Sequence, residues 1–95
     1  MKLVTIVCEA YAQEPVTKLL RDAGAHGWTL FAVEGDGSRG KRPADIREFA
    51  NIQIEVIVPP EVSQTLLERL EKEFFSRYAM IAFESDVRVL RPKKF

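Results

Sequence analysis

The chain has 95 residues, of which 46% are hydrophobic and 29% charged, and its 14 lysines and arginines balance its 14 aspartates and glutamates. This length suits one domain with one core, and the composition is that of a folded protein rather than a disordered or membrane-spanning one. The zero net charge argues against a generic nucleic-acid binder and leaves copies of the chain free to associate, because they repel one another weakly.

The first half of the chain predicts two strands around a helix. Residues 2–8 are apolar and rich in β-branched side chains, which favours a strand. A helix is expected over 15–23, with Pro15 in its first turn and Gly24 at its end. Its apolar stripe consists of Val16, Leu19, Leu20 and Ala23. The aromatic and β-branched run 28–34 predicts the second strand.

The second half repeats this arrangement after a long loop, predicted over 35–48. Residues 49–58 alternate between apolar and polar side chains, as in a strand with one buried face. Two consecutive prolines end that strand and open a second helix. The apolar residues of this helix recur at steps of four: Val62, Leu66, Leu70 and Phe74. Residues 79–84 and 86–91 then predict two short strand segments.

This βαββαβ order predicts an α+β fold of the ferredoxin-like type, with residues 1–95 forming a single domain. Both helices would pack on one face of a four-stranded antiparallel sheet. The strands over 2–8 and 28–34 are apolar on more than one side, yet no segment is left to cover the second face. We therefore expect a homo-oligomer, in which another copy of the chain covers that face.

The long loop carries the clearest functional signal, the sequence GDGSRGKR over 35–42. It is much longer than a hairpin needs, and such loops are usually functional or mobile. Its glycines let backbone N–H groups converge, and its arginines can form paired hydrogen bonds with phosphate or carboxylate. The predicted anion or bicarbonate site consists of Ser38, Arg39, Lys41 and Arg42. A solvated basic loop, in which the glycines only turn the chain, is the alternative.

Residues 24–37 read GAHGWTLFAVEGDG, the pattern G-x-x-G-x-T, five residues, then G-x-G. This pattern resembles the second-strand signature of the PII superfamily of trimeric signalling proteins. The stretch NIQIEVIVPPE resembles the strand that follows their long loop, and SDVRVLR resembles their last strand. The similarity extends over residues 2–91 with the pieces in the same order.

A closer resemblance is to the PII-like branch associated with inorganic carbon, which includes the partner of a bicarbonate transporter and carboxysome-associated proteins. That branch has G-A-K-G-Y-T before a G-x-G-S-R-x-x-R loop, where this chain has GAHGWT and GDGSRGKR. Its A-N-I-K-F-E and Y-A-G-I-I stretches correspond to ANIQIE and YAMIA here.

The resemblance implies a homotrimeric sensor of adenine nucleotide, with ADP or AMP as the first candidates and ATP or cyclic AMP as others. The nucleotide would lie between subunits, no cofactor would be tightly bound, and bicarbonate could share the arginine-lined pocket. The implied nucleotide-binding residues are Thr29, Gly35, Gly37, Ser38, Arg39, Arg42, Met80, Ile81 and Arg91. The flexible loop over 35–48, the T-loop of this family, would present the signal to a bicarbonate transporter or a carboxysome component.

Catalysis has little support in the sequence. The single cysteine, Cys8, ends an apolar strand and is interpreted as packing, and it indicates a reducing, cytoplasmic location because no disulfide can form within the chain. His26 lies between glycines and is interpreted as a solvated loop residue, and Glu84 and Asp86 as solvated turn carboxylates. We therefore expect neither an enzyme nor a metal site.

Other binding classes remain open at this stage. A CutA-like trimer would share the fold, but one histidine and one cysteine make a poor soft-metal site. RNA binding on the sheet would need exposed aromatics, whereas the polar face of the third strand carries Asn51, Gln53 and Glu55. A plain oligomerisation module is the last alternative. The aromatic residues interpreted as core or interface packing are Tyr11, Trp28, Phe31, Phe74 and Phe75.

Overall fold

The computed structural model describes residues 1–34 and 51–94, so the loop predicted over 35–48 lies outside the described residues. A four-stranded sheet has the order β2-β3-β1-β4, and every neighbouring pair is antiparallel. The strands are β1 (Lys2–Glu9), β2 (Thr29–Val33), β3 (Asn51–Val58) and β4 (Met80–Asp86). The first and third strands in the sequence therefore form the centre of the sheet, and β2 and β4 form its edges.

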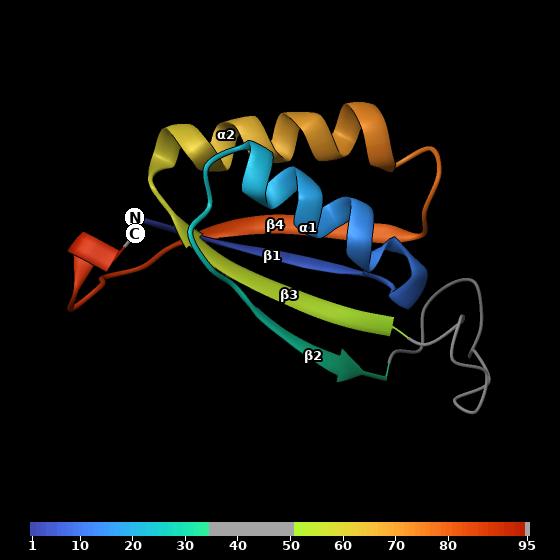
Figure 1. Ribbon diagram of the computed structural model, residues 1–95, viewed down its shortest axis with the longest axis horizontal. Coiled ribbons are helices and arrows are strands. Elements are labelled where there is room, and N and C mark those ends of the chain that lie inside the picture. Colours follow the sequence, from blue (N-terminus) through green and yellow to red (C-terminus); the bar gives the residue numbers. More distant parts are fainter. Residues whose placement is uncertain (35–50, 95) are drawn as a thin grey trace.

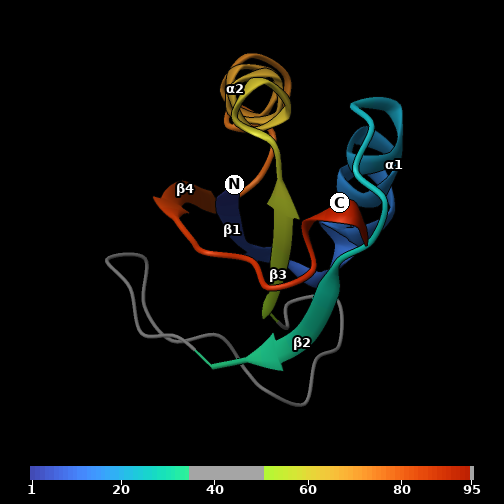
Figure 2. The same ribbon diagram turned by 90° about the vertical axis from the view of Figure 1, so that its left-hand side faces the viewer.

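Two helices lie over the same face of this sheet (Figures 1 and 2). Helix α1 (Gln13–Asp22) follows a short 3-10 turn, η1 (Ala10–Ala12), and helix α2 (Pro60–Arg69) continues into a π-helical turn, η3 (Leu70–Phe74). The π-turn carries a hydrogen bond from the Phe75 N–H to the Leu70 carbonyl, 3.1 Å long. The predicted ferredoxin-like arrangement, with both helices on one face of an antiparallel sheet, is confirmed.

The ends of α1 explain its length. The helix begins at Gln13, two residues before the predicted start, because η1 leads into it directly. Pro15 still lies in the first turn, where its missing N–H breaks no helical hydrogen bond. Gly24 has a φ of 97°, and the following Ala25 N–H reaches back to the Leu20 carbonyl at 2.9 Å. The predicted glycine stop is therefore confirmed, since only glycine adopts this left-handed backbone without strain.

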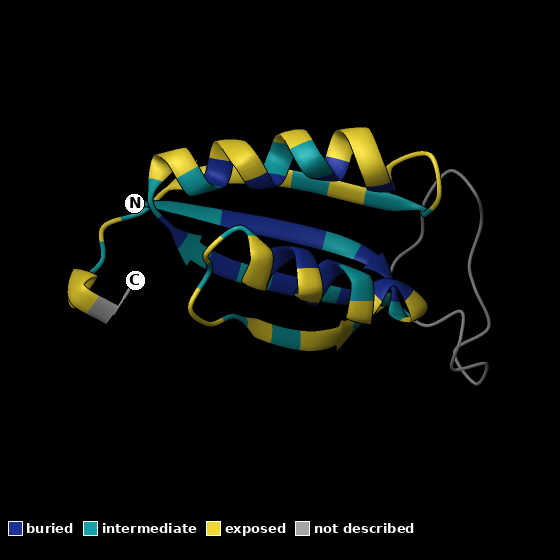
Figure 3. Ribbon diagram, turned by 45° about the horizontal axis from the view of Figure 1, so that its top comes forward, coloured by how far each residue is buried: buried dark blue, intermediate teal, exposed yellow. Residues whose placement is uncertain are grey.

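The core lies between the helices and the two central strands (Figure 3). β3 alternates strictly between buried and half-buried residues, as its sequence pattern predicts. From α2 and η3, Leu66, Leu70 and Phe74 are buried as expected, but Val62 is only partly buried and the neighbouring Ser63 is fully buried. The remaining core residues are Val4, Ile6, Cys8, Ala12, Val16, Leu19, Leu20, Ile52, Ile54, Val56 and Val58.

The C-terminal part of the chain departs from the prediction. Two strand segments are predicted here, over 79–84 and 86–91, but the structure has one strand, β4, which ends at Asp86. The prediction of a strand over 86–91 is therefore wrong beyond Asp86. The reason is the lack of a partner. The pairing of β4 with β1 ends at Asp86 and Lys2, the Val87 N–H donates to the Met1 carbonyl at 3.2 Å, and residues 88–91 form no ladder within the described part of the chain. A short turn, η4 (Pro92–Lys94), follows.

The sheet face opposite the helices exposes large apolar side chains on both edges: Phe31 of β2 and Ile81 and Phe83 of β4, which are 39%, 60% and 52% exposed. We call this surface the open face. Half-buried Val7 and Ile57 of the central strands lie between the two edges on the same face. Cover by another copy of the chain stays a prediction. Among the described residues no helix is long and apolar enough to cross a membrane.

Candidate functional site

Four of the nine implied nucleotide-binding residues belong to the described part of the chain: Thr29, Met80, Ile81 and Arg91. Gly35, Gly37, Ser38, Arg39 and Arg42 lie outside it, together with Lys41 of the predicted anion site. The residues on either side of that gap are placed. β2 ends at Val33 and β3 begins at Asn51, and these two are paired in register. We call this end of the sheet the loop end.

Thr29 is the first residue of β2 and is exposed. It is paired with Glu55 of β3, so its side chain lies on the open face, in the same row as Phe83 at the other edge. β2 is an edge strand of the sheet, so half of its backbone N–H and C=O groups point away from β3. Thr29 thus offers a hydroxyl beside backbone groups that a ligand can reach.

Met80 and Ile81 begin β4 at the loop end. The Met80 side chain points toward the helices and packs against the core, whereas Ile81 lies on the open face and is 60% exposed. β4 is the other edge strand, so its outer backbone groups also face away from the sheet. A planar base that has both a hydrogen-bond donor and an acceptor, as adenine has, can pair with a free backbone C=O and N–H of this kind.

A carboxylate that the sequence did not single out stands beside these residues. The Glu9 side chain is almost fully buried, and its Oε1 accepts a hydrogen bond of 3.1 Å from the Ala79 N–H. Ala79 directly precedes β4. The sequence gives only a weak signal for this contact, because an acidic residue after an apolar strand usually marks a solvated strand end.

Arg91 lies far from the residues at the loop end. It is exposed and belongs to the segment after β4, which leaves the sheet at the end opposite the loop end (Figure 1). Thr29 and Ile81 are also apart, since three strand spacings of roughly 4.8 Å put about 14 Å between the β2 and β4 edges. One chain therefore does not bring Thr29, Ile81 and Arg91 together around a single small ligand.

The start of the segment that carries Arg91 is held by a polar cluster. Lys2 lies 2.6 Å from the Asp86 carboxylate and 3.7 Å from Glu84, and the buried Ser63 hydroxyl donates to Glu84 at 2.5 Å. The hydrogen bond from Lys2 lowers the pKa of Asp86, and the same bond raises the pKa of Lys2. Glu84 and Asp86 are exposed as expected, but their placement in a turn is wrong, because β4 runs through both, and they contact Lys2 of β1 and Ser63 of α2.

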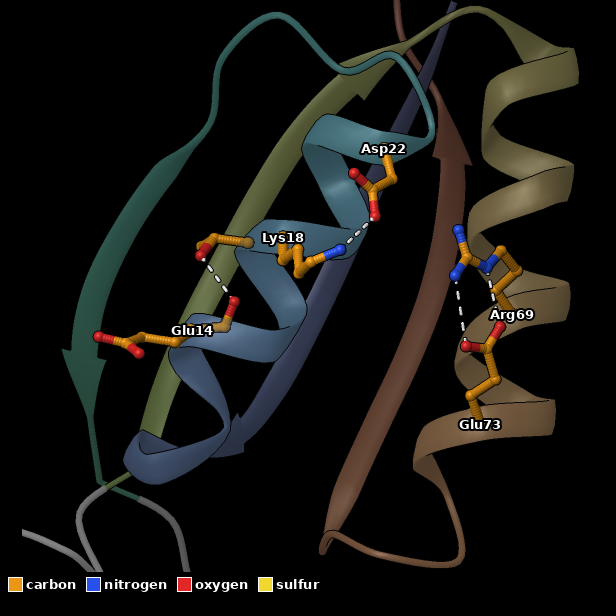
Figure 4. Close-up of polar contacts among 6 residues, drawn as sticks. Glu14, Lys18, Asp22, Arg69 and Glu73 are labelled. Atoms are coloured by element: carbon orange, nitrogen blue, oxygen red, sulfur yellow. Dashed lines mark hydrogen bonds and ion pairs between the residues drawn. The ribbon is translucent and has the colours of Figure 1, made fainter.

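A second set of charges lies on the helix layer (Figure 4). Lys18 and Asp22 are 2.9 Å apart on α1, and Arg69 and Glu73 are 2.8 Å apart on α2 and η3. The pKa of Asp22 is lowered mainly by its hydrogen bond with Lys18 and, more weakly, by Arg69 across the helix pair. The Arg21 guanidinium lies 5.1 Å from the centre of the Trp28 ring. The two ion pairs each lie within one helical segment, and the Arg21–Trp28 contact joins α1 to the residue before β2.

The two residues weighed as nucleophile or base behave as predicted. Cys8 is buried in the core, and burial, aided by the neighbouring charge of Glu9, raises its pKa to about 11. At neutral pH the group is a thiol rather than the reactive thiolate. His26 is exposed. Within residues 1–34 and 51–94, no group of histidine, cysteine and acidic side chains could hold a metal ion.

Comparison with known proteins gives the family. The family model for nitrogen regulatory protein P-II matches residues 1–94. A structure described as that of a PII-like signalling protein from Thermus thermophilus is 41% identical, with a TM-score of 0.87 over 99% of this chain and 93% of its own. The PII-like protein CPII from Thiomonas intermedia, bound to ADP, AMP and bicarbonate, is 34% identical, with a TM-score of 0.89 over 99% and 92%. The chain belongs to the P-II family of nitrogen regulatory proteins.

Proposed function

We propose that this protein is a PII-like regulatory sensor, rather than an enzyme, which binds an adenine nucleotide between neighbouring subunits of a homotrimer. ADP and AMP are the leading ligands. The observation that carries the proposal is the similarity to CPII, whose structure with ADP, AMP and bicarbonate aligns with 99% of this chain at 34% identity. A second CPII structure, with ADP and bicarbonate, is 35% identical over the same share.

The separation of the described site residues supports a site between subunits. Thr29 is on one edge of the sheet, Ile81 on the other, and Arg91 beyond the end of β4 away from the loop end. A nucleotide that contacts all three needs at least two chains. Apolar residues on both edges of the open face provide the surface that a neighbouring copy would cover. Adenine would meet the free backbone edge at Met80 and Ile81, and Thr29 would hydrogen-bond the ribose.

The phosphates would be held by the loop. Gly35 and Gly37 would let backbone N–H groups approach them, and Ser38, Arg39 and Arg42 would supply donors matched to oxyanion geometry. Bicarbonate is a smaller planar oxyanion, and it would share Ser38, Arg39, Lys41 and Arg42 when the nucleotide leaves room. Arg91 would reach the phosphates from a neighbouring subunit.

Signalling would follow from a shift in loop conformation. Ligand anions paired with the arginines would favour one arrangement of residues 35–48 over others and so expose or hide a surface for a protein target. We propose that this target acts in inorganic-carbon metabolism, as a bicarbonate transporter or a carboxysome component in the cytoplasm. The free energy needed to order the loop would weaken binding, which suits a reporter of cellular adenylate levels.

Titration calorimetry tests this proposal. ADP, AMP, ATP and cyclic AMP are titrated into the protein with and without bicarbonate, and light scattering reports the subunit number. The double variant Arg39→Ala/Arg42→Ala should lose the ADP signal and remain a trimer. Lys18→Ala/Arg69→Ala removes two cations from the helix layer and should bind as the wild type does. If the wild-type protein is a trimer but binds none of the four nucleotides at millimolar concentration, the proposal is wrong, and a plain oligomerisation module is the function that remains.

A further inference from the structure

Glu9 is the one charged residue of the described chain that is almost completely buried, at 7% exposure. Removing a carboxylate from water is costly unless hydrogen bonds compensate it. A glutamate in such a position therefore needs hydrogen-bond donors around its carboxylate. The Ala79 backbone N–H is one such donor, at 3.1 Å from Glu9 Oε1.

The strand register explains what this hydrogen bond does. The β1–β4 pairing ends at Cys8 and Met80, so Glu9 and Ala79 would be the next pair. The Ala79 N–H bonds to the Glu9 side chain at this position. The carboxylate thus adds a hydrogen bond between β1 and the residue before β4, one position beyond the last paired residues. This bond is charge-assisted and therefore stronger than a neutral one. The backbone that leads into Met80 and Ile81 is fixed by this contact.

Aromatic rings also contact the turn that leads into β4. The Tyr78 ring lies 5.3 Å from Tyr11 and 5.8 Å from Phe74, measured between ring centres. Tyr11 is in η1, two residues after Glu9, so β1 and η1 both contact the turn that leads into β4. Glu9 is also paired with Asn51, the first residue of β3, which places it at the loop end beside the predicted adenine contact.

We propose that Glu9 is a positioning residue for the base of the bound nucleotide, which it serves by fixing the backbone of residues 79–81. The identity of the ligand in this inference rests on the proposed function. The hydrogen bond between Glu9 and the Ala79 N–H does not, because it is present in the chain without any ligand. Glu9 does not touch the phosphates in this scheme. Its loss should therefore weaken recognition of the base and leave recognition of the anion unchanged.

The test compares two ligands and two substitutions by calorimetry. Glu9→Ala should weaken ADP binding about tenfold, since the partly buried Ala79 N–H loses its acceptor, while the affinity for inorganic pyrophosphate should stay within about twofold. Glu9→Gln keeps an acceptor oxygen and should restore most of the ADP affinity. Glu73→Gln is the matched control, because Glu73 also accepts a hydrogen bond, from Arg69, but does so on the helix layer, and it should bind both ligands normally.

Amide hydrogen exchange on the wild-type protein without nucleotide provides a measurement that needs no variant. The Ala79 amide should be protected, and in Glu9→Ala it should exchange at least about tenfold faster. An unprotected Ala79 amide in the wild type, or wild-type ADP affinity in Glu9→Ala, would overturn the inference alone. An equal loss of ADP and pyrophosphate binding would overturn it too, because general damage would then explain the result. Absence of ADP binding to the wild type overturns the proposed function instead.

Discussion

The Lys2 ammonium and the Asp86 carboxylate lie 2.6 Å apart and join the beginning of β1 to the end of β4. Asp86 is mostly exposed and Lys2 is about one quarter exposed, so solvent weakens their attraction. The pair nevertheless holds the position at which the chain leaves the sheet toward Arg91. Its strength should depend on pH, because each partner shifts the pKa of the other.

Asp86→Asn should lower the free energy of unfolding at neutral pH. The pKa of Asp86 is lowered in the folded state, so its contribution to stability is complete above the unfolded value of about 3.9 and is lost as the pH falls through the folded pKa. Urea unfolding should show a difference between wild type and variant at pH 7 that shrinks as the pH is lowered below about 3.9. In a Lys2→Met background, Asp86→Asn should lower the free energy of unfolding little further. A loss as large as in the wild-type background would show that the two residues do not stabilise the fold through each other.

Gly24→Ala should destabilise the protein by about 1–2 kcal/mol, because Gly24 has a φ of 97° and alanine is strained in that region. Gly27→Ala is the matched control. Neither position has an atom within 4 Å of an added Cβ, and Gly27 lacks the positive φ, so its substitution should change stability by no more than about 0.5 kcal/mol. Thermal unfolding of both variants measures the difference, and equal losses would contradict a conformational cause.

Cys8 should react slowly with thiol reagents in the native protein. Its burial and its raised pKa of about 11 both keep the thiolate scarce at pH 8. The rate measured with a chromogenic disulfide should rise by at least about tenfold when the chain is unfolded in urea. Fast labelling of the folded protein would show that the strand end opens readily.

Phe83→Glu should dissociate the oligomer if another copy covers the open face. Phe83 is 52% exposed on β4 and lies among the apolar residues of that face, where a buried charge would be costly. Light scattering over a range of concentrations should give a smaller mass for this variant. Phe75→Glu changes a residue of similar exposure that follows η3, and it should keep the wild-type mass. A Phe83→Glu protein of unchanged mass would place the interface elsewhere.

Local sequence patterns predict most of the fold because they report directly on burial. The alternation in β3 and the glycine after α1 each reflect one physical constraint, and the structure confirms both. Residues 87–91 show the limit of such patterns. Their β-branched composition favours a strand, but a strand also needs a partner, and the pairing of β4 with β1 ends at Asp86. Composition alone does not show at which residue the hydrogen-bonded pairing of two strands ends.

The candidate site is less accessible from the sequence. Thr29, Met80, Ile81 and Arg91 come from the family resemblance, and no local pattern shows that one chain keeps them on opposite edges and ends of the sheet. Glu9 escapes sequence reasoning for a related reason. Its role depends on the pairing of β1 with β4, and residues that are 70 positions apart share no sequence signal of contact.

The central position of β1 also has a kinetic consequence. Its hydrogen bonds go only to strands that come much later in the chain, up to Asp86, which is 84 positions from Lys2. Such a topology has a high contact order, so folding should be slow for a domain of this size and should wait until the last strand is available. The entropy of closing these long segments grows only logarithmically with length. Lengthening or shortening the connection between β2 and β3 by a few residues should therefore barely alter the folding equilibrium, so any constraint on the length of that connection would come from binding rather than from folding.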